Sequence, residues 1–205
     1  MNINNKSTLI ILDWDDTLFP TSWVNKNNIE IMNNSKFIYK KYFENIDLSL
    51  IKLLKILVEC GDVIIITNAL LNWIDISSRI LPITNKFLKT INNIKIVSAR
   101  GEYSSISDDL MDWKKMAFQN ELSKKTKTQK INNIISIGDA EYEYHALLNL
   151  YRGEPHNYRL LKSVKFLKYP NNNQILEQIN IMNNAVEKVC THTGHLDLHI
   201  SNIKF

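Results

Sequence analysis

The chain has 205 residues, of which 44% are hydrophobic and 22% are charged, and its net charge is +4. These values are typical of a folded, water-soluble protein and exclude disorder along the whole length. No apolar segment has the roughly 18 residues that a membrane span needs, and the first residues do not resemble a signal peptide. Two cysteines are too few for a disulfide framework, so we expect the protein in the reducing cytoplasm. The length favours a single domain over residues 1–205.

Five segments are predicted to be buried strands because they are short, rich in β-branched residues and bounded by polar or turn residues. Their apolar character is almost continuous. This is typical of parallel strands that helices cover on both faces. In chain order the segments are Thr8–Trp14, Val63–Thr67, Ile94–Ser98, Ile134–Ile137 and Val164–Leu167.

Segments with an apolar face alternate with these strands and predict helices. Gly61 is expected to end the first of them as the residue that follows a helix C-terminus. Lys124–Lys130 is expected to be a solvated basic loop. Strands that alternate with helices predict an α/β fold, a three-layer α/β/α sandwich around a mainly parallel five-stranded sheet. The predicted helices are Leu48–Glu59, Trp113–Leu122, Tyr142–Leu150 and Gln174–Cys190, with a core over residues 8–168 and a C-terminal helix and tail over 170–205.

Three acidic residues follow the first predicted strand directly: Asp13, Asp15 and Asp16. Side chains two residues apart in an extended chain lie on the same side, so Asp13 and Asp15 are expected to converge. Two carboxylates held close together repel each other unless a cation or a shared proton intervenes. The plainer interpretation is a polar cap in which Asp16 or Thr17 bonds to nearby backbone. Three acids in four residues favour a functional site instead.

Polar groups also follow two other strands. Thr67 and Asn68 end the second strand where a helix is expected to begin, a place that suits either an anion site or a simple helix cap. The fourth strand runs into Asp139 and Glu143, which adds carboxylates at the same edge of the sheet. Lys114 is expected at a helix start, where a nearby acid cluster would offset the unfavourable helix dipole.

The order of these groups resembles the four motifs of the haloacid dehalogenase (HAD) superfamily of phosphohydrolases. The resemblance covers about residues 8–168 and implies a HAD-like Rossmannoid fold. Four longer phrases are similar to an uncharacterised branch from unicellular eukaryotes, which indicates no substrate. The motifs are Asp13-x-Asp15-x-Thr17, Thr67, Lys114 and Gly138-Asp139-x3-Glu143, and the phrases are DWDDTLFPTSW, ITNALLNWI, IVSAR and WKKMAF.

This resemblance implies a Mg²⁺-dependent phosphatase. Asp13 would be the nucleophile and would form an aspartyl-phosphate. Asp15 would protonate the leaving oxygen and then activate water. Magnesium would be held by Asp13, by the main-chain carbonyl of Asp15 and by Asp139, with phosphate and water oxygens completing its six ligands.

The remaining motif residues would bind the phosphoryl group or support the residues that do. Thr67, Asn68 and Lys114 would form the phosphate-binding set. Lys115 competes with Lys114 for the motif position, and Lys114 is preferred because of its place in the phrase WKKMAF. Glu143 would orient metal-bound waters or Lys114.

The gaps between motifs are too short for a full cap domain. There are 49 residues between Thr17 and Thr67 and 45 between Asn68 and Lys114, and each gap already contains predicted elements. We therefore expect a capless or small-flap site. In this superfamily an open site suits a bulky phosphorylated substrate such as a phosphoprotein or a nucleic-acid end, although small metabolites stay open. Most tryptophans near the motifs are expected in the core, with one or two beside the cleft: Trp14, Trp23, Trp73 and Trp113.

Two alternatives to a phosphatase stay open. A phosphotransferase or mutase of the same superfamily would need an acceptor that outcompetes water. A binding or regulatory module would keep the fold without turnover. The mild positive charge without a basic stripe gives little support for nucleic-acid binding other than as substrate, and no membrane partner is expected.

The C-terminal segment carries residue types that bind metals. Their spacing matches no zinc pattern, so a turn at Gly194 followed by a final strand or tail is preferred. These residues are Cys190, His192, His195 and His199.

Overall fold

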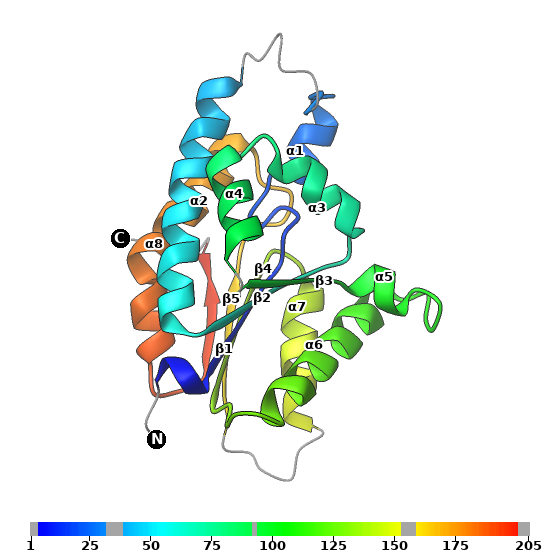
Figure 1. Ribbon diagram of the computed structural model, residues 1–205, viewed down its shortest axis with the longest axis vertical. Helices are drawn as coiled ribbons and strands as arrows, with labels where there is room; N and C mark the ends of the chain where they lie inside the picture. The colour runs from blue at the N-terminus through cyan, green and yellow to red at the C-terminus, as the bar shows by residue number, and fades with distance from the viewer. Residues whose placement is uncertain (1–3, 32–38, 92–93, 153–158, 201–205) are drawn as a thin grey trace.

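A computed structural model describes residues 4–31, 39–91, 94–152 and 159–200. Its centre is a parallel sheet of six strands in the order β3-β2-β1-β4-β5-β6 (Figure 1). The α/β class and the parallel sheet are confirmed, but the expected strand number of five is wrong. The strands are β1 Thr8–Leu12, β2 Asp62–Thr67, β3 Ile94–Ser98, β4 Asn133–Gly138, β5 Leu160–Lys165 and β6 Leu196–His199.

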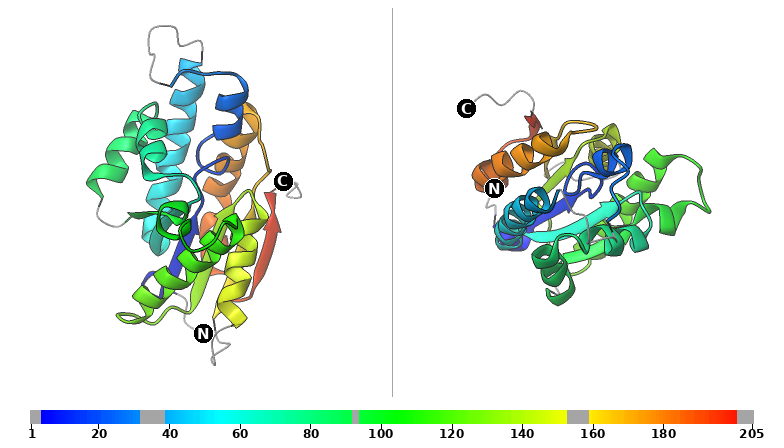
Figure 2. Two further views of the ribbon diagram at one scale, coloured as in Figure 1. Left: turned by 90° about the vertical axis from the view of Figure 1, so that its right-hand side faces the viewer. Right: turned by 90° about the horizontal axis from the view of Figure 1, so that it is seen from above.

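Helices cover both faces of the sheet (Figures 1 and 2). On one face, the buried side chains come mainly from α2 and α8, with one each from α1 and α3. On the other face, they come from α5, α6 and α7. The helices are α1 Thr21–Lys26, α2 Lys40–Cys60, α3 Leu71–Ser78, α4 Pro82–Thr90, α5 Ala99–Tyr103, α6 Leu110–Thr126, α7 Glu141–Arg152 and α8 Asn172–Thr191, and a short 3₁₀ turn, η1 Asn5–Ser7, precedes β1.

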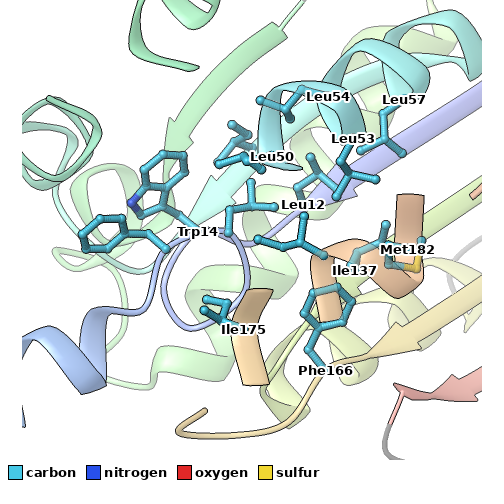
Figure 3. Close-up of a cluster of buried hydrophobic side chains, with 14 of the residues drawn as sticks. Leu12, Trp14, Leu50, Leu53, Leu54, Leu57, Ile137, Phe166, Ile175 and Met182 are labelled. Atoms are coloured by element: carbon cyan, nitrogen blue, oxygen red, sulfur yellow. The ribbon is translucent and has the colours of Figure 1, made fainter. Parts of the chain in front are cut away.

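The central strands are apolar throughout because each face of the sheet buries alternate side chains. In β1, Ile10 and Leu12 belong to the α2/α8 core, whereas Leu9 and Ile11 belong to the core under α6 and α7. Figure 3 shows Leu12 among leucines of α2 and near Met182 of α8. The absence of polar alternation in the sequence was therefore a correct sign of a two-sided sheet.

The two last strands differ from the expected pattern. β5 begins at Leu160, four residues before the expected Val164, because Lys162 is fully buried within it. A lysine in the middle of a strand looks like a boundary in the sequence, but here main-chain carbonyls accept its protons. β6 is a short edge strand in which exposed and partly buried residues alternate. This weak pattern explains why the sequence could not distinguish a final strand from an unstructured tail.

The helix boundaries also shift. α2 begins at Lys40 rather than Leu48, since Asp47, a polar residue in the apolar pattern, is buried and accepts hydrogen bonds from the main-chain N–H groups of Ile83 and Thr84, both at 2.8 Å. Gly61 follows α2 with extended backbone rather than the left-handed conformation. Its lack of a side chain matters for packing, because a Cβ there would lie 2.6 Å from the Thr8 carbonyl oxygen.

Four helices were not named from the sequence, and one expected loop is partly helical. The described residues between β1 and β2 form α1 and α2, and those between β2 and β3 form α3 and α4. The expected basic loop at Lys124–Lys130 begins too early, because α6 continues to Thr126. Within the described residues, every helix falls short of the length and apolar character needed to cross a membrane.

The strand order places a switch point between β1 and β4. From β1 the chain moves to β2 and β3 on one side, and then returns to place β4 on the other side. In open parallel sheets, ligands bind outside the carboxyl ends of the strands where this reversal occurs. The residues that follow β1 and β4 are therefore the first place to look for a site.

Candidate active site

A fully buried lysine joins the groups at this switch point. Asp13 follows β1 directly, and its N–H donates to the Ile137 carbonyl of β4. Lys114 reaches from α6 to the Asp13 carboxylate, with Nζ 2.6 Å from Oδ1, and to the Glu143 carboxylate, 2.7 Å from Oε1. Its third acceptor is the Ile66 carbonyl of β2, at 2.5 Å. The end of β1, strand β2 and two helices thus meet at one ammonium group.

The two candidate lysines are separated clearly by their surroundings. Lys114 is 1% exposed and lies inside the acid cluster. Lys115 points outward, and its Nζ is 3.2 Å from Oδ1 of Asp112 on the same helix. Because α6 begins at Leu110, with Asp109 capping the N–H of Met111, Lys114 lies in the second turn. Lys114 is therefore not at the start of the helix as expected, and the carboxylates, not the helix dipole, explain the position of its side chain.

The charges in this cluster shift one another's pKa values. Burial raises the pKa of Asp13 well above its usual value, opposed by Lys114 and reinforced by Glu143 and Asp139. Burial also raises the pKa of Asp139 to about 7, with Glu143 and Asp16 adding to the rise. For Lys114, burial alone would lower the pKa, but the carboxylates of Asp13 and Glu143 outweigh it and raise the pKa. The lysine is therefore held in its charged form.

Asp15 lies at the same loop but has different partners. Thr67 Oγ1 donates to its Oδ2 at 3.0 Å, and Trp73 Nε1 donates to its Oδ1 at 2.7 Å. The Thr21 hydroxyl, at the start of α1, also donates to Oδ1. Asp13 and Asp15 thus emerge from the same strand end, but the first carboxylate turns to the buried lysine and the second to a cluster of neutral donors.

Asp16 has a structural place in this loop. It has a left-handed backbone with φ of 56°, a conformation in which aspartate is one of the better tolerated residues. Its Oδ1 accepts from the N–H of Ser22 at 2.8 Å, and the Ser22 hydroxyl donates to Oδ2. The plainer interpretation of Asp16, local bonding to the following backbone, is confirmed, and this bonding fixes the turn that carries Asp13 and Asp15.

Thr67 ends β2 beside this loop and Asn68 follows it, and each side chain donates one hydrogen bond. Thr67 Oγ1 donates to Asp15 and accepts the N–H of Ala69 at 2.9 Å. Asn68 Nδ2 donates to the Leu110 carbonyl at 3.2 Å, which ties β2 to the start of α6. The next helix, α3, begins only at Leu71, so neither residue caps it in the expected way.

Glu143 holds the lysine from the opposite side. It lies in the first turn of α7, where its Oε2 accepts the N–H of Ala140 at 3.2 Å while its Oε1 binds Lys114. A Cβ at Gly138 would lie 2.4 Å from Cγ of Glu143. The glycine therefore leaves the space that the Glu143 side chain occupies. Of the two interpretations of Glu143, the contacts support the one in which it orients Lys114.

An open cleft of about 490 Å³ lies beside Asp15. Its lining combines side-chain amides, one indole and one guanidinium, and the cation among these groups is Arg100 on α5. Trp73 both lines the cleft and holds Asp15. The lining residues are Asp15, Thr21, Asn25, Asn68, Ala69, Leu70, Asn72, Trp73 and Arg100.

The acidic residues of this region include the ligands that the expected magnesium ion would need. Four acidic side chains in this region are buried, Asp13, Asp16, Asp139 and Glu143, and the buried ammonium among them is that of Lys114. In the part of the chain that the structure describes, no group of three or more His, Cys, Asp and Glu side chains is arranged to hold a metal. The expected set has only two carboxylates and a carbonyl oxygen, and such oxygens suit a hard cation. The buried acids outnumber the buried ammonium, and a bound cation would favour the ionised forms of Asp13 and Asp139, which burial disfavours.

The C-terminal histidines and Cys190 lie away from this site. His195 Nδ1 accepts the N–H of Leu161 at 3.1 Å, and His199 lies 3.7 Å from Asp197 in β6. Cys190 is buried near the end of α8. Gly194 precedes β6, and the segment after it forms the final strand, which was one of the two expected possibilities.

No protein-family model, curated protein or solved structure matches the chain. Sequence reasoning missed the donors to Asp15 from Thr21 and Trp73, and it missed Arg100 in the cleft. Trp73 was among the tryptophans of which one or two were expected beside the cleft. Thr21 and Arg100 lie in the phrases DWDDTLFPTSW and IVSAR, but neither was assigned a role from the sequence.

Proposed function

We propose that the chain is a Mg²⁺-dependent phosphomonoester hydrolase of the HAD type, working through an aspartyl-phosphate on Asp13. The observation that carries the proposal is the Lys114 ammonium, buried between the carboxylates of Asp13 and Glu143 at the switch point of a parallel sheet. A buried, charged cluster in this position is costly for the fold and is typical of a functional site.

The contacts divide the work of Asp13 between its two oxygens. Oδ1 is bound by Lys114 at 2.6 Å, whereas Oδ2 has a looser contact, 3.5 Å from the Thr17 hydroxyl. Oδ2 is therefore the better placed oxygen to attack phosphorus. Its bond to phosphorus forms as the bond from phosphorus to the leaving oxygen breaks.

Asp15 is placed for proton transfer. It gives a proton to the leaving oxygen and then takes one from the water that attacks the aspartyl-phosphate, which releases phosphate and restores Asp13. Thr67, Trp73 and Thr21 hold this carboxylate beside the cleft. Magnesium, held by Asp13, Asp139 and the main-chain carbonyl of Asp15, would supply the positive charge that lets a carboxylate approach an anionic phosphoryl group.

The structure favours charge compensation over direct phosphate binding for Lys114. An ammonium has three protons to donate, and three acceptors surround Nζ: Asp13, Glu143 and the Ile66 carbonyl. Direct contact with a phosphoryl oxygen would require one of these to be released. Lys114 is therefore proposed to keep Asp13 ionised and oriented, the positioning part of its expected role.

The cleft supports an extended phosphorylated substrate. It is open, and its lining includes both Asp15 and the solvent-exposed guanidinium of Arg100. Amides and an indole can hydrogen-bond and stack on a polar chain, and Arg100 can bind a second anionic group. We propose a phosphoprotein or a nucleic-acid end as the substrate class.

Turnover of an aryl phosphate with and without Mg²⁺ tests the reaction. Asp13→Asn should reduce kcat by about 10⁴-fold or more, because the nucleophile is lost. Asp15→Asn should slow either half of the reaction by roughly 10²–10⁴-fold. Asp112→Asn, a change of the same kind on the exposed side of α6, serves as the control and should keep full activity.

Arg100 tests the substrate class separately. Arg100→Ala should raise KM for a phosphopeptide or a 5′-phosphorylated oligonucleotide by about 10-fold, the value of one charge-assisted contact. KM for a small aryl phosphate should stay the same, because that molecule carries no second anionic group for Arg100 to bind. Equal effects on large and small substrates would remove Arg100 from the recognition surface.

Two alternatives are distinguished by the same assays. A phosphotransferase would release less phosphate than leaving group when a hydroxyl acceptor is added, because the acceptor captures the aspartyl-phosphate. A non-catalytic module would show no turnover across a varied panel of phosphosubstrates in Mg²⁺. In that case phosphate binding should still depend on Mg²⁺ and on Asp139.

A further inference from the structure

The only two cysteines of the chain lie against each other although 130 positions separate them. Cys60 is the last residue of α2, and Cys190 is the second to last of α8. Their side chains come close enough for each thiol to shift the pKa of the other. They lie on the α2/α8 face of the sheet, where Cys190 belongs to the buried core and Cys60 packs against it.

The packing of α2 on α8 brings the two thiols together. Both helices run antiparallel to the strands and lie side by side (Figures 1 and 2). Midway along them, Ser49 donates to Asn180, and Asn183 Nδ2 donates to the Ser49 carbonyl at 3.0 Å. From Ser49 to Cys60 is a rise of about 16 Å, and from Asn180 to Cys190 about 15 Å, at 1.5 Å per residue. The helix register therefore places the cysteines level with each other.

The two thiols differ in access and in chemical character. Cys60 is partly exposed, and the neighbouring Cys190 thiol lowers its pKa, with burial and the carboxylates of Glu187 and Glu59 acting against it. Cys190 is buried, and the neighbouring Cys60 thiol and its burial raise its pKa. The Lys162 ammonium lies at the end of α8 and donates to the carbonyls of Val189 and Cys190 at 2.8 and 2.9 Å. Cys60 thus has the features of an attacking thiol, and Cys190 those of a resolving one.

We propose that Cys60 and Cys190 form a reversible redox couple that closes to an intramolecular disulfide when the protein meets hydrogen peroxide. The Cys60 thiolate attacks one peroxide oxygen, the O–O bond breaks, and Cys60 becomes a sulfenic acid as the first water forms. Cys190 sulfur then attacks the Cys60 sulfur, the S–O bond breaks, and the second water leaves with the Cys190 proton. Two electrons pass from the two sulfurs to the peroxide, and a dithiol returns both on reduction.

This couple stands apart from the proposed phosphatase site. It lies where α2 runs into β2 and α8 ends before β6, at the amino ends of the strands, whereas Asp13 and Asp139 follow the carboxyl ends of β1 and β4. The disulfide would join two helices that cover the same face of the sheet. It is therefore expected to stabilise the fold against unfolding and to leave aryl phosphate turnover unchanged. The proposal does not depend on the reaction at Asp13.

The test uses the full chain, hydrogen peroxide as oxidant and dithiothreitol as reductant. Peptide mapping without reduction should show one linked pair that contains Cys60 and Cys190, two free thiols lost per monomer, and two hydrogen atoms lost in mass. Dithiothreitol should restore both thiols. The oxidised wild-type chain should have a higher Tm than the reduced chain, and Cys60→Ser should abolish this rise.

Several results would overturn the proposal. Two free thiols after exposure to peroxide, a link between two chains, or sulfinic acid at Cys60 with Cys190 still reduced would each exclude the couple. Cys190→Ser separates these cases, because in this variant Cys60 should stop at sulfenic acid, which dimedone traps. If either variant fails to fold, the peptide map of the wild-type chain still decides the outcome.

Discussion

Two lysines in different parts of the fold are fully buried, one on α6 and one in β5. Lys114 lies beyond the carboxyl ends of β1 and β4, with two carboxylates and a carbonyl around its ammonium. Lys162 lies within β5, and its ammonium donates to the Val189 and Cys190 carbonyls at the end of α8. Burial lowers the pKa of Lys162 to about 8, whereas the carboxylates raise the pKa of Lys114 above its usual value.

The comparison shows that burial and charge compensation act separately. Both ammonium groups have left water, so desolvation acts against the charge of both. Carbonyls at the end of a helix satisfy the protons of Lys162 and offer only partial negative charge. Full carboxylates are needed to hold a buried lysine charged, and only the site at the carboxyl edge provides them. This difference supports a chemical role for Lys114 and a structural role for Lys162.

The largest expected effect comes from removing the Lys114 charge. Lys114→Met leaves Asp13 and Glu143 buried together without a cation, which should lower the free energy of unfolding by about 3–5 kcal/mol. Urea denaturation measures this effect. Lys115→Met is the matched control and should leave stability close to that of the wild type, because Lys115 lies outside the cluster.

The cause of that loss can be separated from lost packing. Combining Lys114→Met with Asp13→Asn and Glu143→Gln removes all three charges at once, so most of the lost stability should return. Saturating Mg²⁺ should restore part of it in the single variant if the cluster holds a cation. If the triple variant is as unstable as Lys114→Met alone, lost packing rather than charge is the cause.

The second prediction concerns Lys162 and the dependence of stability on pH. Its folded pKa of about 8 is lower than its ordinary value of 10.5. Between these two values the unfolded chain binds more protons, so the free energy of unfolding should rise with pH. The cost of burying the charge is fully present below about pH 8. It should be relieved by on the order of 3 kcal/mol as the pH approaches 10.5.

Lys162→Met isolates this effect. Urea denaturation at several values between pH 7 and 10.5 should show a smaller rise for the variant than for the wild type. Both chains carry the same two thiols, so the difference between the two curves reports on Lys162. Parallel curves would mean that Lys162 keeps its ordinary pKa, and the contrast with Lys114 would be lost.

The sequence predicted best what depends on local pattern. The continuous apolar strands predicted a sheet buried on both faces, and the acids that follow them predicted that Asp13, Asp139 and Glu143 would share one edge. Each of these follows from strand period and from the geometry of parallel sheets. These patterns do not choose between Lys114 and Lys115, so Lys114 was preferred only because of its place in the phrase WKKMAF. The choice depends on the fold, because adjacent residues on a helix point in different directions.

What the sequence could not predict depends on tertiary partners. The expected strand began at Val164 and left out Lys162, because the carbonyls that accept its protons come from α8. Asp47 looked like a break in α2 because the N–H groups that it binds belong to α4. Trp73 is 58 positions from Asp15, and no periodicity connects the two. In each case a polar group is buried by a partner that only the fold brings close.

The smallest of the three effects concerns Gly138, which borders the acid side of the Lys114 cluster. A Cβ at this position would lie 2.4 Å from Cγ and 2.8 Å from Cδ of Glu143. Gly138→Ala should therefore displace the Glu143 side chain and lower the free energy of unfolding by about 1–3 kcal/mol. Gly194→Ala is the control, since the atom nearest to its Cβ is the ring end of the exposed His192.

A double-mutant cycle shows whether Glu143 is the reason for the glycine. In a Glu143→Ala background the obstructing atoms are gone, so adding Gly138→Ala should cost much less than it does in the wild type. Additive losses would mean that the backbone at Gly138, and not its neighbour, requires a glycine. A large coupling would mean that this glycine serves the contact between Glu143 and Lys114, the contact that distinguishes Lys114 from Lys162.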